Sequence, residues 1–243
     1  MSSMVEKLRR KLRRHGFWSS LQQLVLRLLK CTDQLRILRG LRIEQVDPAF
    51  LGCEPRYTSA FQPLRTLRRF AVAPASEISH RFLREAMRKG DACYAVCDGP
   101  RLVSSSWYST QPTAIDSPEL VLHVPPGYIY MYKGLTRESY RGQRLYEVGV
   151  TRALQHYLAQ GARGFVSYVD ATNLDSLKAS LRMGYRVFGS IYVLRLFGRH
   201  FIFSSRGCRD FGFRLEVLGE RAARGNRPQR LHPASAHANV PVV

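Results

Sequence analysis

The stretch YRGQRLYEVGV, residues 140–150, combines a glycine turn, two arginines and the start of an amphipathic helix. Where a helix starts, backbone N–H groups lack partners within the helix, and the helix dipole adds partial positive charge. The free N–H groups expected here belong to Gly142, Gln143, Arg144 and Leu145, with the side chains of Arg141 and Arg144 beside them. The stretch indicates either a phosphate-binding turn or a plain strand-to-helix connection on a basic protein.

Strands and helices alternate around this turn. The pattern predicts a tyrosine-rich strand over 127–135, a helix over 144–160, a buried strand over 165–169, a helix capped by Asn173, and one or two strands over 185–203. This β-α-β-α-β order predicts a mixed sheet that helices cover.

Helix 144–160 is predicted to turn one apolar stripe toward the core, formed by Tyr146, Val150, Ala153, Leu154 and Tyr157. Gly149 costs about 1 kcal/mol inside a helix relative to alanine, so its presence predicts close packing at that position.

A second segment, VDATNLDSLKASLRMGY at residues 169–185, follows about thirty residues after the turn. Together the two segments resemble the GNAT superfamily of acyl-CoA-dependent N-acyltransferases. In that family an R-G-x-G-x-G/A turn holds the acyl-CoA pyrophosphate, and a V-x-x-x-N…G-F segment forms the neighbouring strand and helix. Arg141 and Gly142 match the turn, while the later segment is matched by Val169, Asn173, Gly184 and Tyr185, the last in place of phenylalanine. The resemblance is specific over 128–190 and extends more broadly over 35–204.

The resemblance implies a mixed α/β fold with a GNAT-like twisted sheet, helices on both faces, and a domain spanning 35–220. It implies an N-acyltransferase that moves an acyl group from acyl-CoA to a primary amine by direct attack, with acetyl-CoA as the preferred co-substrate and no metal. The cofactor contacts that it implies are Gly134, Leu135, Thr136, Arg141, Gly142, Gln143, Arg144, Leu145, Asn173 and Ser176, the first three through strand-like pairing with the pantetheine arm.

Three positions depart from the family pattern. Arg144 and Tyr146 replace small residues of the turn, although the backbone N–H of Arg144 remains and its guanidinium can reach a phosphate. Many members also place a tyrosine seven residues after the asparagine, where it protonates the departing thiolate. This chain has Ser180 there, a shorter side chain and a poorer acid.

The sequence leaves open which residue is the general base. The strand over 127–135 holds no carboxylate, so the candidates are Glu138, His123, Glu119 and Asp170, with Ser180 as the candidate acid. Glu138 can instead pair with an arginine, Asp170 can support the Asn173 helix, and His123 can be an ordinary loop histidine. Orientation of a low-pKa amine without a dedicated base is a further alternative. Three tyrosines are candidates for the acceptor groove or for packing: Tyr130, Tyr132 and Tyr168.

The first half of the fold is predicted as a strand over 35–46, a proline-rich loop region to 74, and a helix that Ser76 caps and that runs to 89. Two strands follow over 92–97 and 102–109, and then a loop to residue 127. The inward positions expected of the helix are Ile78, Phe82 and Met87.

The net charge of +20 is concentrated at the ends of the chain. Residues 1–30 carry eight Lys or Arg and one Glu, and the tail 221–243 carries four Arg and no acid. The tail is predicted to be disordered. The extension 1–34 is predicted to hold two amphipathic helices, the second with a stripe of Leu21, Leu24, Val25, Leu28 and Leu29. That stripe either meets an anionic membrane or an acidic carrier protein, or docks on the chain's own core.

The five scattered cysteines show no CxxC pair, which favours reduced thiols and no metal site. With no convincing secretory signal and no apolar run near 20 residues, the chain is expected to be cytoplasmic, or peripheral at the inner face of a membrane. The acceptor is expected to be a small-molecule or peptide amine.

Three other functions are alternatives to an acyl-CoA-dependent enzyme. The basic surface is compatible with an acyl carrier protein as the donor, and the departures in the turn are compatible with an inactive GNAT-like binding or membrane-associated protein. Nucleic-acid binding is disfavoured, because no recognition module interleaves aromatic residues with the arginines.

Overall fold

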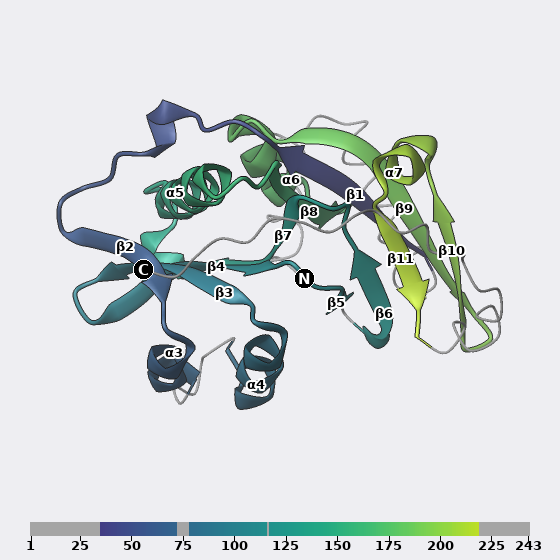
Figure 1. Ribbon diagram of the computed structural model, residues 1–243, viewed down its shortest axis with the longest axis horizontal. Helices are drawn as coiled ribbons and strands as arrows, with labels where there is room; N and C mark the ends of the chain where they lie inside the picture. Colours follow the sequence, from purple (N-terminus) through teal and green to yellow (C-terminus); the bar gives the residue numbers. More distant parts are fainter. Residues whose placement is uncertain (1–34, 72–77, 116, 219–243) are drawn as a thin grey trace, which may run out of the picture.

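The computed structural model describes residues 35–71, 78–115 and 117–218, which form two sheets and their covering helices (Figure 1). The strands are β1 (Leu35–Ile43), β2 (Tyr57–Gln62), β3 (Ala92–Asp98), β4 (Arg101–Ser109), β5 (Thr113–Ile115), β6 (Ser117–His123), β7 (Tyr128–Thr136), β8 (Gly164–Asp170), β9 (Arg186–Leu196), β10 (Arg199–Ser204) and β11 (Arg214–Val217). The helices are α3 (Leu64–Ala71), α4 (His80–Lys89), α5 (Leu145–Ala159), α6 (Leu174–Arg182) and α7 (Arg206–Phe211), with short 3-10 turns η1 (Pro48–Phe50) and η2 (Glu138–Tyr140).

The main sheet has eight strands in the order β10-β9-β1-β8-β7-β4-β3-β2. Neighbouring strands of this sheet pair antiparallel, except β7 and β8, which pair parallel. The chain between β7 and β8 forms α5, a crossover helix of the kind that joins parallel strands. A three-stranded sheet, β11-β6-β5, packs beside it. The predicted mixed α/β fold, with helices covering the sheet, is confirmed.

Helices lie on both faces of the main sheet. Figure 1 shows α5 on one side of the β2–β4 half and α3 and α4 on the other. The face under α5 carries a core of apolar residues that includes Val150, Leu154 and Phe165. The opposite face carries two further clusters, one under α3 and α4 and one under the small sheet and α7. Gly149 is closely packed as predicted, since a Cβ there would lie 3.3 Å from Val96.

Strand β1 occupies the middle of the sheet, although it is the first described element. It pairs with β8 through Ile43↔Phe165 and with β9 through Leu35↔Leu194. The apolar pattern of residues 35–46 predicted a strand, but its central place follows from pairings more than 100 residues away along the chain.

Two regions predicted as loops contain regular structure. Residues 47–74 include β2 and α3, and residues 109–127 include β5 and β6. Proline at 63 precedes α3, where its fixed φ starts a helix rather than breaking one. The chain after residue 203 also adds α7 and β11.

The start of α4 differs from the prediction. Its N-cap is Ser79, whose hydroxyl accepts a hydrogen bond from the Phe82 N–H at 3.1 Å, and Ser76 lies outside the described residues. Met87 was expected to face inward, but it is 43% exposed, and the buried positions of α4 are Leu83 and Ala86. Gly90 ends the helix in the left-handed conformation, as predicted.

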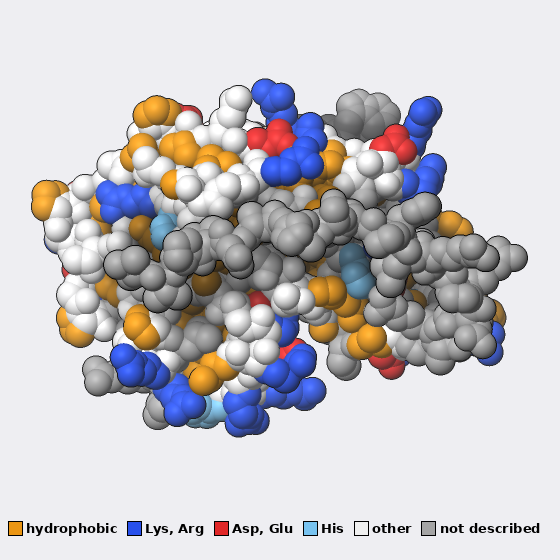
Figure 2. Space-filling model, viewed as in Figure 1, with side chains coloured by type: hydrophobic (Ala, Val, Ile, Leu, Met, Phe, Trp, Pro, Cys, Tyr) orange, Lys and Arg blue, Asp and Glu red, His pale blue; other side chains and the backbone are white. Residues whose placement is uncertain are grey.

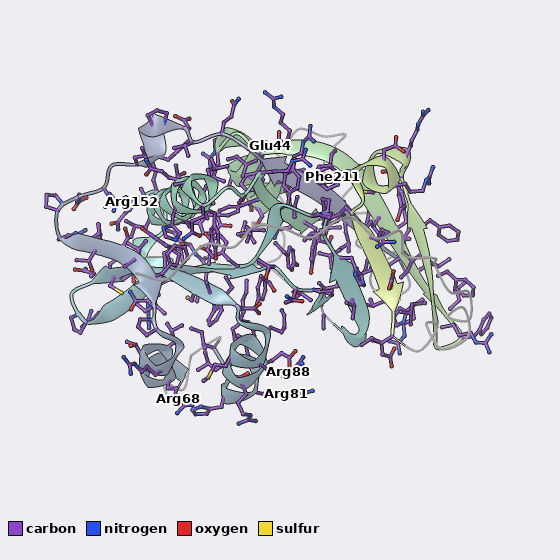
Figure 3. All side chains as sticks on the ribbon, in the orientation of Figure 1. Glu44, Arg68, Arg81, Arg88, Arg152 and Phe211 are labelled. Atoms are coloured by element: carbon purple, nitrogen blue, oxygen red, sulfur yellow. The ribbon has the colours of Figure 1, made fainter. Side chains whose placement is uncertain are left out.

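Side-chain contacts tie the loop 44–56 to the rest of the fold. Arg152 of α5, labelled in Figure 3, donates to the Leu51 carbonyl at 2.9 Å and to the Ser59 hydroxyl at 2.6 Å. Glu44, also labelled, accepts from the Tyr128 hydroxyl. These contacts fix β2 and the loop beside the N-terminal half of α5.

Basic side chains gather at one end of the molecule. Figure 2 shows Lys and Arg over α3 and α4, and Figure 3 labels Arg68, Arg81 and Arg88 there. Arg88 pairs with Glu85 at 2.7 Å. The excess of cations creates a positive potential at this end of the sheet.

The predictions for the extension 1–34 and the tail 221–243 lie outside the described residues. No helix among the described residues is long and apolar enough to cross a membrane. The four described cysteines, Cys53, Cys93, Cys97 and Cys208, are free thiols.

Candidate active site

The start of α5 presents unpaired backbone N–H groups. Gly142 (φ 84°) and Arg144 (φ 58°) both have left-handed backbone conformations, and in the described part of the chain no side chain caps the helix. The first helical hydrogen bond runs from the Val148 N–H to the Arg144 carbonyl, so the preceding N–H groups lie outside the helical ladder. Backbone N–H groups left outside the helical ladder at a helix start, together with the helix dipole, are suited to bind anions.

Two tyrosines anchor the turn to the neighbouring strands. The Tyr57 hydroxyl at the start of β2 donates to the Gln143 carboxamide oxygen. The Tyr140 hydroxyl donates to Asp98 at the end of β3, at 3.0 Å. Contacts from β2 and β3 therefore hold the turn in place.

Three arginines surround the turn. Arg141 is largely exposed and lies 3.9 Å from the Glu138 carboxylate, a weak surface pair that a phosphate can displace. Arg144 stands at the helix start. Arg56 donates to Gln143 at 3.4 Å and lies over the Tyr57 ring, so β2 brings a third guanidinium to the turn. No motif marks Arg56 in the sequence, because it reaches the turn only through the β2–β3 pairing.

Strands β7 and β8 stop pairing beside this turn. Their parallel pairing runs from Tyr128↔Gly164 to Tyr130↔Val166, whereas β7 continues to Thr136 and β8 to Asp170. Lys133 has a φ of 49°, and the β4–β7 register shifts opposite it, so β7 bends away from β8. The carboxyl ends of parallel strands that separate in this way are where open α/β sheets bind ligands.

The bent end of β7 holds the residues expected to pair with a cofactor. On one edge, Leu135 and Thr136 pair with Ser105 and Ser104 of β4. The Ser104 hydroxyl also contacts the Leu135 carbonyl and the Thr136 hydroxyl, each at 3.0 Å. Within the described residues β8 does not pair with the other edge of this segment, which leaves that edge to an extended ligand.

Tyr146 packs against this end of β7. A Cβ on Gly134 would lie 2.5 Å from the Tyr146 ring and 2.9 Å from its hydroxyl, so the ring position requires glycine at 134. The Tyr146 hydroxyl lies 3.5 Å from the Met131 sulfur. Burial, and less strongly the Glu147 carboxylate, raise the pKa of Tyr146 above its usual range, so the hydroxyl stays protonated at neutral pH. The predicted core packing of Tyr146 is confirmed.

Asn173 caps α6 as predicted, since its side-chain oxygen accepts from the Ser176 N–H at 3.2 Å. Both residues follow the carboxyl end of β8. The carboxamide NH₂ group of Asn173 is a donor that this cap does not use.

The five candidate catalytic residues lie at different places, and their roles stay predictions. Glu119 of β6 lies 3.6 Å from the His200 Nδ1. Glu138 is exposed in η2 beside Arg141. Asp170 accepts from the Thr172 N–H at 3.0 Å and from its hydroxyl at 2.6 Å, which shapes the loop before α6. His123 pairs with Glu216 at 3.2 Å in the small sheet, before the amino end of β7. Ser180 lies in the last turns of α6, where its carbonyl accepts from Met183 and Tyr185.

The tyrosines proposed for the acceptor groove take part in packing. Tyr130 and Tyr168 belong to the apolar cluster under the small sheet, and the Tyr130 and Tyr132 rings stack at 5.3 Å. The Tyr132 hydroxyl donates to Asp91 at 2.6 Å. Burial, and then this hydrogen bond, raise the pKa of Tyr132 far above its usual range.

Asp91 is a buried carboxylate that the sequence did not single out. One of its oxygens takes the Tyr132 hydroxyl and the Lys89 ammonium, the latter at 2.9 Å, while the other has no hydrogen-bond partner among the described residues. Lys89 also donates to Thr113 at 2.7 Å. In the sequence, Asp91 stands out only as part of the Lys-Gly-Asp at the end of α4, and this pattern equally well indicates the end of a helix.

A separate cavity of about 510 Å³ lies at the amino end of β7, between residues 124–129 and the residues that follow α5. It is at the opposite end of β7 from the turn, so it is distinct from the candidate site at the start of α5.

Comparisons with known proteins give matches among solved structures. No protein-family model and no curated protein matches the sequence. A GCN5-related N-acetyltransferase from Sphaerobacter thermophilus is 17% identical with a TM-score of 0.47, over 74% of this chain and 56% of that one. A GCN5-related N-acetyltransferase-like protein from Streptococcus suis is 16% identical with a TM-score of 0.45, over 68% and 64%. A GNAT-family acetyltransferase from Colwellia psychrerythraea is 14% identical with a TM-score of 0.45, over 68% and 59%. The chain thus spans less than two thirds of the length of each of these structures, and it is similar in structure to GNAT-family acetyltransferases at low sequence identity.

Proposed function

We propose that the protein is an N-acyltransferase that uses acyl-CoA, with acetyl-CoA as the preferred donor and a primary amine as the acceptor. The observation that carries the proposal is the uncapped start of α5, with Gly142 and Arg144 in left-handed conformations, beside the carboxyl ends of two parallel strands that have stopped pairing. A pyrophosphate fits such a start through both its charge and its acceptor oxygens. An extended arm fits the free edge of β7.

The chemistry follows from these groups. The turn and its arginines would hold the pyrophosphate, and the backbone of residues 134–136 would align the arm along β7. The amine would then attack the thioester carbon to form the C–N bond, and the C–S bond would break with its electron pair leaving on sulfur. The proton that the amine nitrogen loses would pass, directly or through water, to the departing thiolate, which gives the amide and the free thiol. Alignment of the two reactants supplies a large part of such a rate enhancement even without a dedicated base.

The first test is calorimetric titration of the full chain with acetyl-CoA and with desulfo-CoA, at low and moderate salt. Arg141→Ala is expected to weaken binding about 10- to 100-fold, because a charge-assisted hydrogen bond to phosphate contributes about 1.5–3 kcal/mol. Arg56→Ala is expected to weaken binding in the same direction, since its guanidinium reaches the same turn.

Arg214→Ala is the matched control, because it removes the same charge from β11 in the small sheet. If Arg141→Ala and Arg214→Ala lower the affinity equally, and salt abolishes both effects, the binding is a general attraction to a basic protein. Absence of any saturable binding would favour a carrier-protein donor or a non-catalytic GNAT-like protein.

A further inference from the structure

An uncovered apolar face lies at the β10 end of the main sheet. Cross-strand pairing places Ile37, Tyr192 and Phe203 in one row and Leu35, Leu194 and Phe201 in the next, all on the side of the sheet that carries α5 and α6. We call these six residues the β10 patch. Tyr192 is 38%, Phe201 45% and Phe203 59% exposed.

Among the described residues, the helices on this side of the sheet pack elsewhere than on the patch. On the same side, α5 packs against β3, β4, β7 and β8, and α6 contributes Leu177 to the same core. On the opposite side, Ile191, Val193 and Ile202 of the same strands are covered by the small sheet and by α7. Contiguous exposed aromatic residues on a sheet face indicate a surface that another element covers.

The chain itself supplies a matching element directly beside the patch. Residues 21–29 carry the helical stripe of Leu21, Leu24, Val25, Leu28 and Leu29. Residues 30–34 connect that stripe to Leu35, which pairs with Leu194 inside the patch. Five extended residues span at most about 17 Å, and three adjacent strands are about 10 Å across, so the stripe cannot lie far from the patch.

The dimensions of the two surfaces also agree. Nine helical residues are about 13 Å long, which is enough to cross β1, β9 and β10. The Arg39 guanidinium donates to the Ser190 hydroxyl at 2.8 Å, and this polar pair forms the next row along β1 and β9, where the patch ends. Because the connection is short, the stripe is present at a high effective concentration and competes well with a separate partner.

We propose that residues 21–29 form a helix that docks on the β10 patch and completes the helical layer on that side of the sheet. The proposal is independent of the acyltransfer reaction. It resolves the alternatives for the amphipathic stripe in favour of intramolecular docking, and it leaves the dense basic residues of 4–14 free to meet an anionic partner.

Cross-linking of the full chain tests the proposal. In a Cys31→Ser background, Leu28→Cys with Phe203→Cys is expected to form a link through a short bis-maleimide within one chain, seen as a monomer by mass. Leu28→Cys with Arg214→Cys, which places the second thiol on exposed β11, is the matched control and is expected to give at least tenfold less link. Links between two chains would overturn the proposal, because the patch would then serve a second copy.

Hydrogen exchange gives an independent readout. Amides of residues 21–29 are expected to exchange at least tenfold more slowly than in an unstructured chain, and Phe201→Asp with Phe203→Asp is expected to abolish that protection. Phe197→Asp, at the fully exposed hairpin tip outside the patch, is expected to leave it unchanged. Protection that appears only with vesicles of an anionic phospholipid, together with no link in the Leu28→Cys/Phe203→Cys variant, would assign the stripe to a membrane and overturn the proposal.

Discussion

Gly164→Ala is expected to destabilise the domain by about 3 kcal/mol, from backbone strain and a steric overlap that add. Gly164 starts β8 with a φ of 150°, and a Cβ there would lie 2.2 Å from the Ile43 carbonyl oxygen and 3.1 Å from the Glu44 Cα. Both contacts are backbone atoms in or next to β1. That strand is paired on both sides, so it cannot move away easily. Thermal unfolding followed by circular dichroism should show a midpoint lower by about 6–12 °C for a domain of this size.

Two other glycines separate the causes of this effect. Gly161 has a φ of 87° with nothing within 4 Å of its Cβ position, so Gly161→Ala tests the backbone conformation alone, at about 1 kcal/mol. Gly52 also has open space but no left-handed backbone, so Gly52→Ala is expected to be neutral or slightly stabilising. If Gly164→Ala costs no more than Gly161→Ala, the close approach of β8 to β1 does not limit stability.

The elements from β7 to α6 could be predicted from the sequence because their signals are local. Apolar spacing at 3.6 residues marks α5, Asn173 caps α6, and Gly161 and Gly184 follow the two helices. In the first half of the chain, β2 has a mixed pattern of burial and prolines surround it, so loops were the better local interpretation. The central place of β1 depends on pairing with β8 and β9, which no local pattern encodes.

The candidate site also has one part that the local sequence predicts and one part that it does not. The free N–H groups at the start of α5 are a property of any helix start, so the sequence predicted them. Arg56, Tyr57 and Asp98 meet the turn from β2 and β3, and Asp91 meets Tyr132 across β4. These contacts join residues more than 40 positions apart, and they follow from the sheet order rather than from any motif.

The contact between Gly134 and Tyr146 leads to the second large effect, on donor binding. A methyl group on Gly134 meets the far end of the Tyr146 side chain, which can rotate away, so Gly134→Ala should leave the fold intact. The displaced ring then has to occupy space beside the free edge of β7, where the proposed cofactor arm lies. We expect acetyl-CoA affinity to fall at least tenfold, about 1.4 kcal/mol, while the variant still unfolds in one cooperative transition, at a midpoint lowered by the lost packing of the ring.

A double-variant cycle identifies the ring as the cause. Tyr146→Ala provides the small side chain that the family pattern has at this position, and it is expected to bind acetyl-CoA as tightly as the unmodified chain or more tightly. Gly134→Ala combined with Tyr146→Ala is then expected to recover the affinity that Gly134→Ala loses, as measured by calorimetry at fixed salt. If the combined variant stays weak, the backbone at Gly134 itself contacts the donor. If neither single change alters the affinity, the donor does not lie along this end of β7.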